Sequence, residues 1–354
     1  MQSPEKMLLK EPIKVGTTLL KNRLVFPPMA TEKAIKGEVS DDLVKFYAEK
    51  TQGGYFALVI QEHSYVSPEG KASKNQVSVA SDATVAGLKK IAAAVHDNGS
   101  KILLQLAHAG SAADEGVTGL SPISCSAIPN MRGFTKGQQD EDFQTTTELA
   151  EDFSDDEMAL PLTFDEIQIV KEKFVKAALR AKQAGYDGCE IHSAHGYLLN
   201  QFYSPLTNKR TDEYSGQTLE GRIRLQKEIV QAIRAKAGAN FLISLRLGAC
   251  DYAEGGTTIE DSVLAAKILQ EAGLDMLSIS GGLCDYTNPT SKRQGWFSDI
   301  SYAIKAQVSM PILLTGGIKD ADVAETLLEE QKADLIGVGR AVLRDSSWAE
   351  KAMS

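Results

Sequence analysis

The residues best suited to chemistry fall in one short segment, Glu190-Ile-His-Ser-Ala-His-Gly-Tyr197, which holds two of the chain's five histidines. The residues before His192 predict a strand that ends there, and one helical turn would bring the ring of His195 to the same side. Imidazole N–H groups can hold a carbonyl or nitro oxygen and stabilise negative charge that develops on it. The phenol of Tyr197 can deliver a proton as a general acid. The segment therefore predicts that His192, His195 and Tyr197 form a catalytic group.

Two other interpretations of this segment are open. A metal site would need further ligands, and the sequence has neither an H-E-x-x-H motif nor a third histidine nearby, so no metal is expected. The other is a pair of histidines packed in the core, although buried histidines usually occur singly. We favour the interpretation that the two histidines are catalytic.

Polar side chains also interrupt two predicted apolar strands at their ends. Arg246 follows Ser244-Leu245. A guanidinium at that position would either form a salt bridge or face an anion, such as the N1/O2 edge of a reduced flavin. Gln105, in Leu-Leu-Gln-Leu-Ala-His, offers both a donor and an acceptor, which suits a pyrimidine-like ring edge. We expect both side chains to contact a cofactor.

Glycines occur where a barrel enzyme would bind phosphate. Thr315-Gly316-Gly317 follows one predicted strand, and Gly337-Val-Gly339-Arg340 follows the next. Glycine lets backbone N–H groups approach phosphate oxygens, and an arginine fork suits a dianion. Ser280-Gly281-Gly282 would complete the cradle. This pattern predicts a phosphate site without separating FMN from a phosphorylated sugar. The alternative is that these glycines only turn the chain.

Short β-branched runs alternate with longer amphipathic ones along the chain. The predicted strands are Arg23–Phe26, Ala57–Gln61, Lys101–Leu106, Gly188–His192, Phe241–Leu245, Met276–Ser280, Pro311–Leu314 and Leu335–Val338. The helical patterns between them cover Asp82–Asn98, Thr163–Ala184, Leu219–Ala237, Ile259–Ala272 and Ala321–Glu330. Thr163 and Glu166 form a capping box, and Gly185 and Gly273 mark helix ends.

Eight strands that each precede a helix or loop predict a closed parallel barrel. A doubly wound sheet usually carries a glycine-rich loop after its first strand, whereas this chain has Phe-Pro-Pro-Met-Ala-Thr there. We therefore expect an α/β fold, a single (β/α)8 TIM-barrel domain over residues 1–354. The residues before Arg23 would form a short N-terminal cap at the bottom of the barrel.

The formal charge of −9 is concentrated in one stretch. Nine acids and no lysine or arginine lie between Asp140 and Glu157, and the remaining 38 acids equal the 38 basic residues. The rest of the surface therefore has no basic excess that would indicate nucleic-acid binding. We interpret residues 137–160 as an acidic surface insertion, either a solvated loop or short helix or a lid over the site.

The hydropathy of the chain and its cysteines predict the compartment in which the protein is found. No stretch approaches the ~20 apolar residues of a membrane span, and the first residues lack the apolar core of a signal peptide. We therefore expect a soluble, cytoplasmic protein with no membrane partner, whose oligomeric state is open. Four cysteines, Cys125, Cys189, Cys250 and Cys284, lie far apart without a C-x-x-C pair. This argues against a zinc ribbon, an iron–sulfur cluster or a disulfide scaffold.

With these residues in place, the sequence resembles the Old Yellow Enzyme family of FMN-dependent ene-reductases (NAD(P)H:flavin oxidoreductases). The similar motifs span nearly the whole chain. They are Asn22-Arg-Leu-Val-Phe-Pro-Pro-Met29, Leu104-Gln-Leu-Ala-His-Ala-Gly110, Ser126-Ala-Ile-Pro129, His192-Ser-Ala-His-Gly-Tyr-Leu-Leu-Asn-Gln-Phe202, Asn208-Lys-Arg-Thr-Asp-Glu-Tyr214 and Gly339-Arg340.

The resemblance implies a role for each candidate residue. His192 and His195 would hold the substrate oxygen, Tyr197 would protonate the α-carbon, and the Glu62–His63 turn would touch the flavin edge. The residues that would bind the cofactor, from flavin to phosphate, are Pro27, Pro28, Met29, Ala30, His63, Gln105, Arg246, Gly281, Gly316, Gly317, Gly339 and Arg340.

The resemblance also implies a ping-pong mechanism with tightly but non-covalently bound FMN. NADH or NADPH would reduce the flavin at N5 and leave, and an α,β-unsaturated carbonyl or nitro compound would then receive hydride at its β-carbon. Two alternatives are open. One is a flavin barrel that acts mainly as a quinone or xenobiotic reductase, and the other is a phosphosugar isomerase or aldolase.

Three positions depart from the family pattern. Ala30 stands where many relatives have a threonine or cysteine that contacts flavin O4. His63 is bulkier than the small residue often found there, and is expected to be either a surface residue or a pocket wall. Ser111 replaces an arginine common after His-Ala-Gly. The loop Cys284–Trp296 shows no recognisable code, so the sequence does not indicate the physiological substrate.

Overall fold

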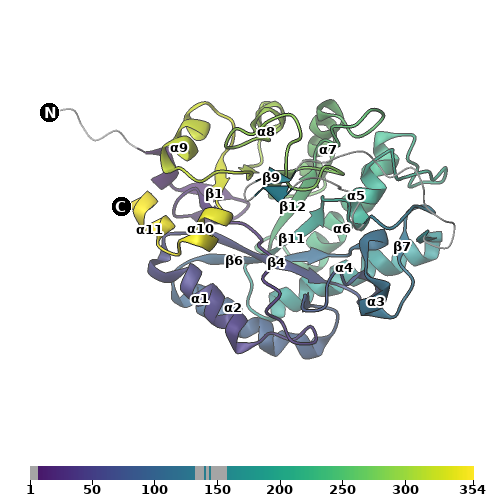
Figure 1. Cartoon of the computed structure of the whole chain (residues 1–354), viewed down its shortest axis with the longest axis horizontal. Coiled ribbons are helices and arrows are strands. Elements are labelled where there is room, and N and C mark those ends of the chain that lie inside the picture. Colours follow the sequence, from purple (N-terminus) through teal and green to yellow (C-terminus); the bar gives the residue numbers. More distant parts are fainter. Residues whose placement is uncertain (1–6, 132–138, 141–142, 145–157) are drawn as a thin grey trace.

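The structure is a computed structural model and describes residues 7–131, 139–140, 143–144 and 158–354. Eight parallel strands close into a barrel (Figure 1), because β3 pairs with both β15 and β4. The barrel strands are β3 (Leu24–Phe26), β4 (Leu58–Tyr65), β6 (Lys101–Ala107), β11 (Gly188–Ser193), β12 (Leu242–Gly248), β13 (Met276–Ser280), β14 (Ile312–Leu314) and β15 (Leu335–Gly337). Each begins within one residue of its predicted start, so the predicted TIM barrel is confirmed.

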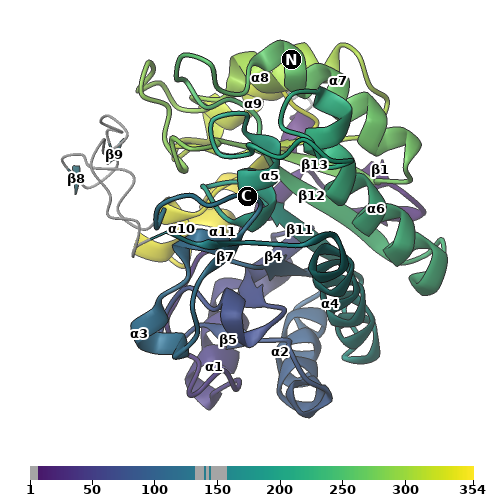
Figure 2. The same cartoon turned by 90° about the vertical axis from the view of Figure 1, so that its right-hand side faces the viewer.

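Helices surround the barrel on the outside (Figure 2). The predicted ones are confirmed as α2 (Val85–Asp97), α4 (Phe164–Gln183), α6 (Leu219–Ala237), α7 (Ile259–Glu271) and α9 (Ala321–Glu329). The capping box of α4 is present, since the Thr163 hydroxyl accepts from the Glu166 N–H and the Glu166 carboxylate accepts from the Thr163 N–H at 2.7 Å. The sequence analysis missed α1 (Asp41–Lys50), α8 (Ser298–Lys305) and the short helices α3 (Glu115–Thr118), α5 (Leu198–Tyr203), α10 (Arg340–Arg344) and α11 (Trp348–Met353).

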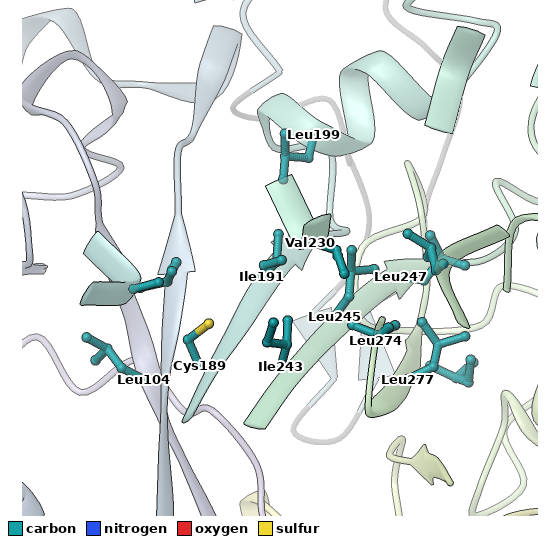
Figure 3. Close-up of a cluster of buried hydrophobic side chains, with 14 of the residues drawn as sticks. Leu104, Cys189, Ile191, Leu199, Val230, Ile243, Leu245, Leu247, Leu274 and Leu277 are labelled. Atoms are coloured by element: carbon teal, nitrogen blue, oxygen red, sulfur yellow. The ribbon is translucent and has the colours of Figure 1, made fainter. Parts of the chain in front are cut away.

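Side chains alternate between the two faces of each barrel strand, and this divides the core in two. Outward-facing side chains pack against the helices (Figure 3), for example Ile191 and Ile243 on the strands and Val230 on α6. Cys189 belongs to this outer layer and is fully buried, so it serves as a small apolar residue of the core.

The N-terminal residues close the bottom of the barrel, as predicted. Strands β1 (Ile13–Val15) and β2 (Thr18–Leu20) form an antiparallel hairpin. Val15 and Leu20 from this hairpin join an apolar cluster with the first residues of barrel strands, such as Leu58, Leu242 and Met276. The cluster fills the barrel interior on the side away from the carboxyl ends of the strands. Interior positions nearer the carboxyl ends lie outside this apolar cluster, so they can hold polar side chains.

The predicted acidic insertion over residues 137–160 lies largely outside the described residues. Within it, β8 (Gln139–Asp140) pairs antiparallel with β9 (Phe143–Gln144). Where the chain is described again, β10 (Leu160–Pro161) pairs parallel with β7 (Ile123–Ser124), and β5 (Val77–Ser78) extends the sheet beside β4. Whether the insertion is a loop or a lid stays a prediction. Among the described helices, none combines the length and the apolar composition needed to span a bilayer.

Candidate active site

A cavity of about 530 Å³ opens at the carboxyl ends of the barrel strands, the end at which TIM barrels carry their active sites. Nearly all of the predicted site residues line it. The lining residues are Pro27, Pro28, Met29, Ala30, His63, Gln105, His192, His195, Tyr197, Arg246, Asp285, Tyr286, Lys292, Gln294, Trp296, Thr315, Gly316, Gly317, Ile318, Lys319, Gly337, Gly339, Arg340, Ala341 and Arg344. The fold therefore brings together residues that are about 300 positions apart in the chain.

The three predicted catalytic side chains meet in this cavity. The rings of His192 and His195 lie edge to face, with their centroids 5.0 Å apart. Tyr197 stacks on His192 at 4.9 Å, with 25° between the ring planes. The link between the histidines differs from the expected helical turn. β11 ends at Ser193, and His195 adopts a left-handed backbone with φ of 59°.

Both histidines are neutral and can act as hydrogen-bond donors. Burial lowers the pKa of His192 and of His195 well below the usual range, and the nearby Arg246 lowers both further. His192 Nδ1 accepts from the Ala194 N–H at 3.3 Å, so its proton lies on Nε2. His195 Nε2 shares a 2.7 Å hydrogen bond with the Ser280 hydroxyl. Neutral N–H donors of this kind are suited to holding an oxygen that becomes negative.

A carboxylate that the sequence analysis missed faces this pair. Asp285 lines the cavity, and its Oδ1 lies 3.9 Å from Nδ1 of His195. Burial raises the pKa of Asp285 to about 6. Its backbone is left-handed, with φ of 63°, an uncommon conformation for a residue other than glycine. No sequence signal marks it, because its position depends on how the loop after β13 folds.

His63 forms a wall of the cavity, which resolves the two expectations for this residue. Its ring stacks on Tyr197 at 5.9 Å and 16°. Burial lowers the pKa of His63 to about 4, so this ring is neutral. The expected Glu62–His63 turn is wrong, because both residues lie inside strand β4, next to an irregularity in its pairing between Gln61 and Ser64.

Glu62 anchors the chain that follows Pro27–Ala30. Its carboxylate accepts hydrogen bonds from the Thr31 hydroxyl at 2.9 Å and from the Tyr47 hydroxyl at 3.1 Å. Burial raises the pKa of Glu62 to about 7. A buried carboxylate therefore holds the cavity-lining loop against the end of β4.

Arg246 and Gln105 reach the cavity from inside the barrel. Arg246 is 8% exposed, and its Nη2 donates to Thr315 Oγ1 at 3.3 Å. Its Nε is buried with no hydrogen-bond partner in the described part of the chain. Gln105 donates from Nε2 to Glu190 at 3.0 Å. The guanidinium therefore has donor capacity left for a ligand that carries an oxygen or nitrogen acceptor.

Four of the predicted phosphate glycines, Gly316, Gly317, Gly337 and Gly339, line the cavity together with Arg340. Gly316 and Gly317 have φ of 124° and 66°, and a Cβ on either would lie within 2.6 Å of Trp296. Their missing side chains therefore accommodate this indole, a role that the sequence did not indicate. The Arg340 guanidinium lies 5.2 Å from the Trp296 ring centroid, within cation–π range.

Gly281 is placed differently from the other predicted cofactor residues, because it does not line the described cavity. Its carbonyl accepts from the backbone N–H of His195 at 3.3 Å. A Cβ at Gly281 would lie 2.0 Å from the Asp285 carbonyl oxygen. Its role in this structure is close packing beneath His195 and Asp285, so contact with the cofactor is not supported for this residue.

The cavity has the dimensions and charge of a cofactor site. Its volume falls in the range of small-molecule sites. Positive side chains outnumber negative ones along its lining, with Asp285 the carboxylate among the residues that line it and Arg246, Lys292, Lys319, Arg340 and Arg344 the cations. In the described residues no cluster of histidine, cysteine, aspartate or glutamate has the makings of a metal site. The arrangement suits a flat ring system with an anionic phosphate.

The barrel and the residues that line its cavity match those of a known protein family. A model of the NADH:flavin oxidoreductase / NADH oxidase family matches residues 8–354. The chain therefore belongs to this family, the Old Yellow Enzyme family, as the sequence resemblance implied.

Three relatives illustrate the likeness. The chain is 36% identical to an NADH oxidase of Thermoanaerobacter brockii over 96% of its own length and 50% of that protein. It is 34% identical to an NADPH dehydrogenase of Halalkalibacterium halodurans, covering 98% of this chain and 94% of that one. The structure of the Old Yellow Enzyme homologue from Zymomonas mobilis superposes with a TM-score of 0.77, 27% identity, and coverage of 97% and 93%. The chain thus spans about half the length of the first relative and nearly all of the other two.

The residues present fit FMN, the cofactor of this family. The buried Nε of Arg246 has no hydrogen-bond partner among the described residues and can donate to an acceptor, which the pyrimidine edge of a flavin offers. Gln105 lines the same cavity, and so do Gly339 and Arg340, whose guanidinium could neutralise a phosphate. Apart from Gly281, the predicted FMN-binding residues line this one cavity, and their contacts with FMN stay a prediction.

Proposed function

We propose that this chain is an NAD(P)H-dependent, FMN-containing ene-reductase that reduces the activated C=C bonds of α,β-unsaturated carbonyl or nitro compounds. The observation that carries the proposal is the stack of Tyr197 on His192, with His195 meeting the same ring 5.0 Å away. It places a proton donor beside two neutral oxygen-binding groups. The names of the relatives, NADH oxidase and NADPH dehydrogenase, support the use of a nicotinamide reductant.

Bound FMN would accept a hydride from NADH or NADPH and pass it to the substrate in a ping-pong cycle. Arg246 and Gln105 would hold its pyrimidine end, Pro27–Ala30 would line the ring, and Gly339 with Arg340 would hold the phosphate. The protein supplies the remaining chemistry through the groups that face the substrate.

The histidine pair binds and polarises the substrate oxygen. Because both imidazoles are neutral, each offers an N–H without adding a full charge to the buried cavity. As hydride reaches the β-carbon, negative charge grows on the oxygen, and these donors stabilise it. Tyr197 then gives its phenolic proton to the α-carbon. His63 stacks on the phenol ring and holds it in place.

A quinone or xenobiotic reductase is the second candidate, because the same histidine pair would hold a quinone oxygen. A quinone is protonated on oxygen, so its reduction does not need Tyr197 at an α-carbon. The phosphosugar isomerase or aldolase alternative loses support, because the two lysines that line the cavity, Lys292 and Lys319, lie in loops, and no described strand end presents a lysine to it.

Half-reactions of the FMN-loaded protein test the proposal. Anaerobic stopped-flow traces would follow reduction by NADPH or NADH, and then reoxidation by 2-cyclohexenone or by a quinone. We expect Tyr197→Phe to slow reoxidation by the enone ~10²–10⁴-fold while flavin reduction stays nearly unchanged, because only the proton to carbon is lost. Reoxidation by the quinone serves as the control and should be much less affected. If enones fail to reoxidise the wild-type flavin, or if both half-reactions slow equally in the variant, the ene-reductase assignment is wrong.

A further inference from the structure

A buried carboxylate, Glu190, lies inside the barrel directly beneath the site. It occupies the middle of β11 and is 0% exposed. In the strand register it is paired with Gln105 on β6 and with Ser244 on β12. Its Oε1 accepts from Gln105 Nε2 at 3.0 Å, and its Oε2 accepts from the Ser244 hydroxyl at 2.8 Å. Both carboxylate oxygens therefore have donors from neighbouring strands.

The contact with Glu190 determines which end of the Gln105 amide is available to a ligand. A primary amide has a donor end and an acceptor end, whereas a carboxylate only accepts. Gln105 must turn its nitrogen toward Glu190, which leaves its carbonyl oxygen for a group in the cavity that it lines. A carbonyl oxygen at this position pairs with an N–H, such as the imide N–H of a flavin.

Glu190 also offsets a buried positive charge. Arg246 is 8% exposed and projects from the adjacent strand β12, in register with His192, two residues beyond Glu190 on β11. Glu190 and Asp285 are the carboxylates that act on this guanidinium through space. A charge placed in the interior without a counter-charge carries a large desolvation cost. Without Glu190, the positive charge of Arg246 would act more strongly on whatever ring lies above it.

We propose that Glu190 is a positioning residue for FMN, which directs the carbonyl of Gln105 into the cavity and offsets the charge of Arg246, so that it sets both FMN affinity and the redox potential of the flavin. The inference rests on FMN binding and does not depend on which substrate the reduced flavin serves. It also explains why a carboxylate occupies the barrel interior, where TIM barrels usually carry branched apolar side chains.

The test is Glu190→Gln, which keeps the size of the side chain and removes its charge. FMN affinity would be measured by quenching of FMN fluorescence on titration with apoprotein, and the midpoint potential by anaerobic reductive titration with a reference dye. We expect FMN to bind about tenfold more weakly, because Gln105 is no longer held in one orientation. We expect the midpoint potential to rise, because the unbalanced Arg246 favours the anionic reduced flavin. Unchanged affinity and potential would overturn the proposal.

Ser244→Ala is the matched control. It removes the other hydrogen bond to Glu190 without changing the charge or touching Gln105. We expect its FMN affinity to stay within about twofold of the wild type and its potential to be unchanged. If Ser244→Ala reproduces both effects of Glu190→Gln, a general loosening of the interior is responsible and the proposal is wrong.

If Glu190→Gln does not fold, a second variant tests the same proposal. Glu190→Asp retains the charge but shortens the reach to Gln105. We expect weaker FMN binding with a potential close to that of the wild type, and a raised potential in Glu190→Asp would contradict the charge argument. Neither measurement uses an enone. A negative ene-reductase assay therefore does not contradict this inference, whereas an FMN titration without the expected change does.

Discussion

Replacement of Asp285 by asparagine should stabilise the protein above neutral pH. Burial raises the pKa of this carboxyl from 3.8 to about 6, although the Tyr286 backbone and Arg246 oppose the shift. A difference of about two pKa units corresponds to about 3 kcal/mol of extra free energy for ionising Asp285 in the folded chain. The side chain is 27% exposed, so this figure is an upper bound.

The sign of the pH dependence follows from linkage. The folded protein holds the proton on Asp285 more tightly than the unfolded chain does, so folding is favoured most below pH 3.8. This contribution is lost as pH rises through about 6. Above that pH the ionised carboxylate lowers the free energy of unfolding by as much as about 3 kcal/mol, and Asp285→Asn avoids this loss.

Urea unfolding of the FMN-saturated protein, followed by circular dichroism at several pH values, measures the effect. The variant should match the wild type near pH 4, exceed its free energy of unfolding increasingly up to about pH 7, and keep that difference up to pH 8. Asp299→Asn is the control, since that carboxylate is 92% exposed and its replacement should change stability by less than about 0.5 kcal/mol at every pH. A difference between Asp285→Asn and the wild type that does not vary with pH would refute the reasoning.

Three further predictions follow from the cavity. Replacing His192 and His195 together by alanine should abolish the coloured complex that phenols form with the bound flavin, because the two oxygen-binding donors are lost; an unchanged phenol titration would contradict the role given to them. Ala30→Thr should raise the flavin midpoint potential by adding a hydrogen-bond donor at the cavity wall, and a redox titration that finds no rise would count against it. Gly317→Ala should lower the melting temperature of the apoprotein by several degrees, since its Cβ would lie 2.3 Å from Trp296 at a φ of 66°; equal melting curves would show that the indole moves aside freely.

The polar interior near the carboxyl ends of the strands is the feature that distinguishes this barrel from a purely structural one. Gln105, Glu190, Ser244 and Arg246 occupy inward-facing positions that could have been filled by apolar side chains. Burying such groups is tolerated only when their hydrogen bonds are made, and most of them are made here. The unpartnered Nε of Arg246 is the exception, and it lies at the cofactor site.

Much of the fold was predictable because its signals are local. Strand starts follow from β-branched runs, and the start of α4 follows from the pairing of Thr163 with Glu166. Helix α1 begins with a comparable local signal. Ser40 caps it by accepting a hydrogen bond from the Leu43 N–H. The sequence signal for helix α8 is weaker, because the helix spans eight residues and its first turn has no side-chain cap.

The side chains that could take part in chemistry were recognisable from residue type and position in the chain. His192, His195 and Tyr197 were identifiable because polar groups at the ends of apolar strands meet at one end of a parallel barrel. Their residue types, together with Arg246, indicated an oxygen-bearing substrate and were compatible with a flavin, whereas FMN itself was implied by the resemblance to the family.

How those groups are held could be seen only once the chain had folded. Glu190 became part of the site through strand register, which pairs it with residues far away in the chain. The fold of one loop brings Asp285 and Trp296 to the cavity, and the same loop packs against Gly281, which does not line it. Register and loop conformation depend on packing between distant segments, and short stretches of sequence do not encode that packing.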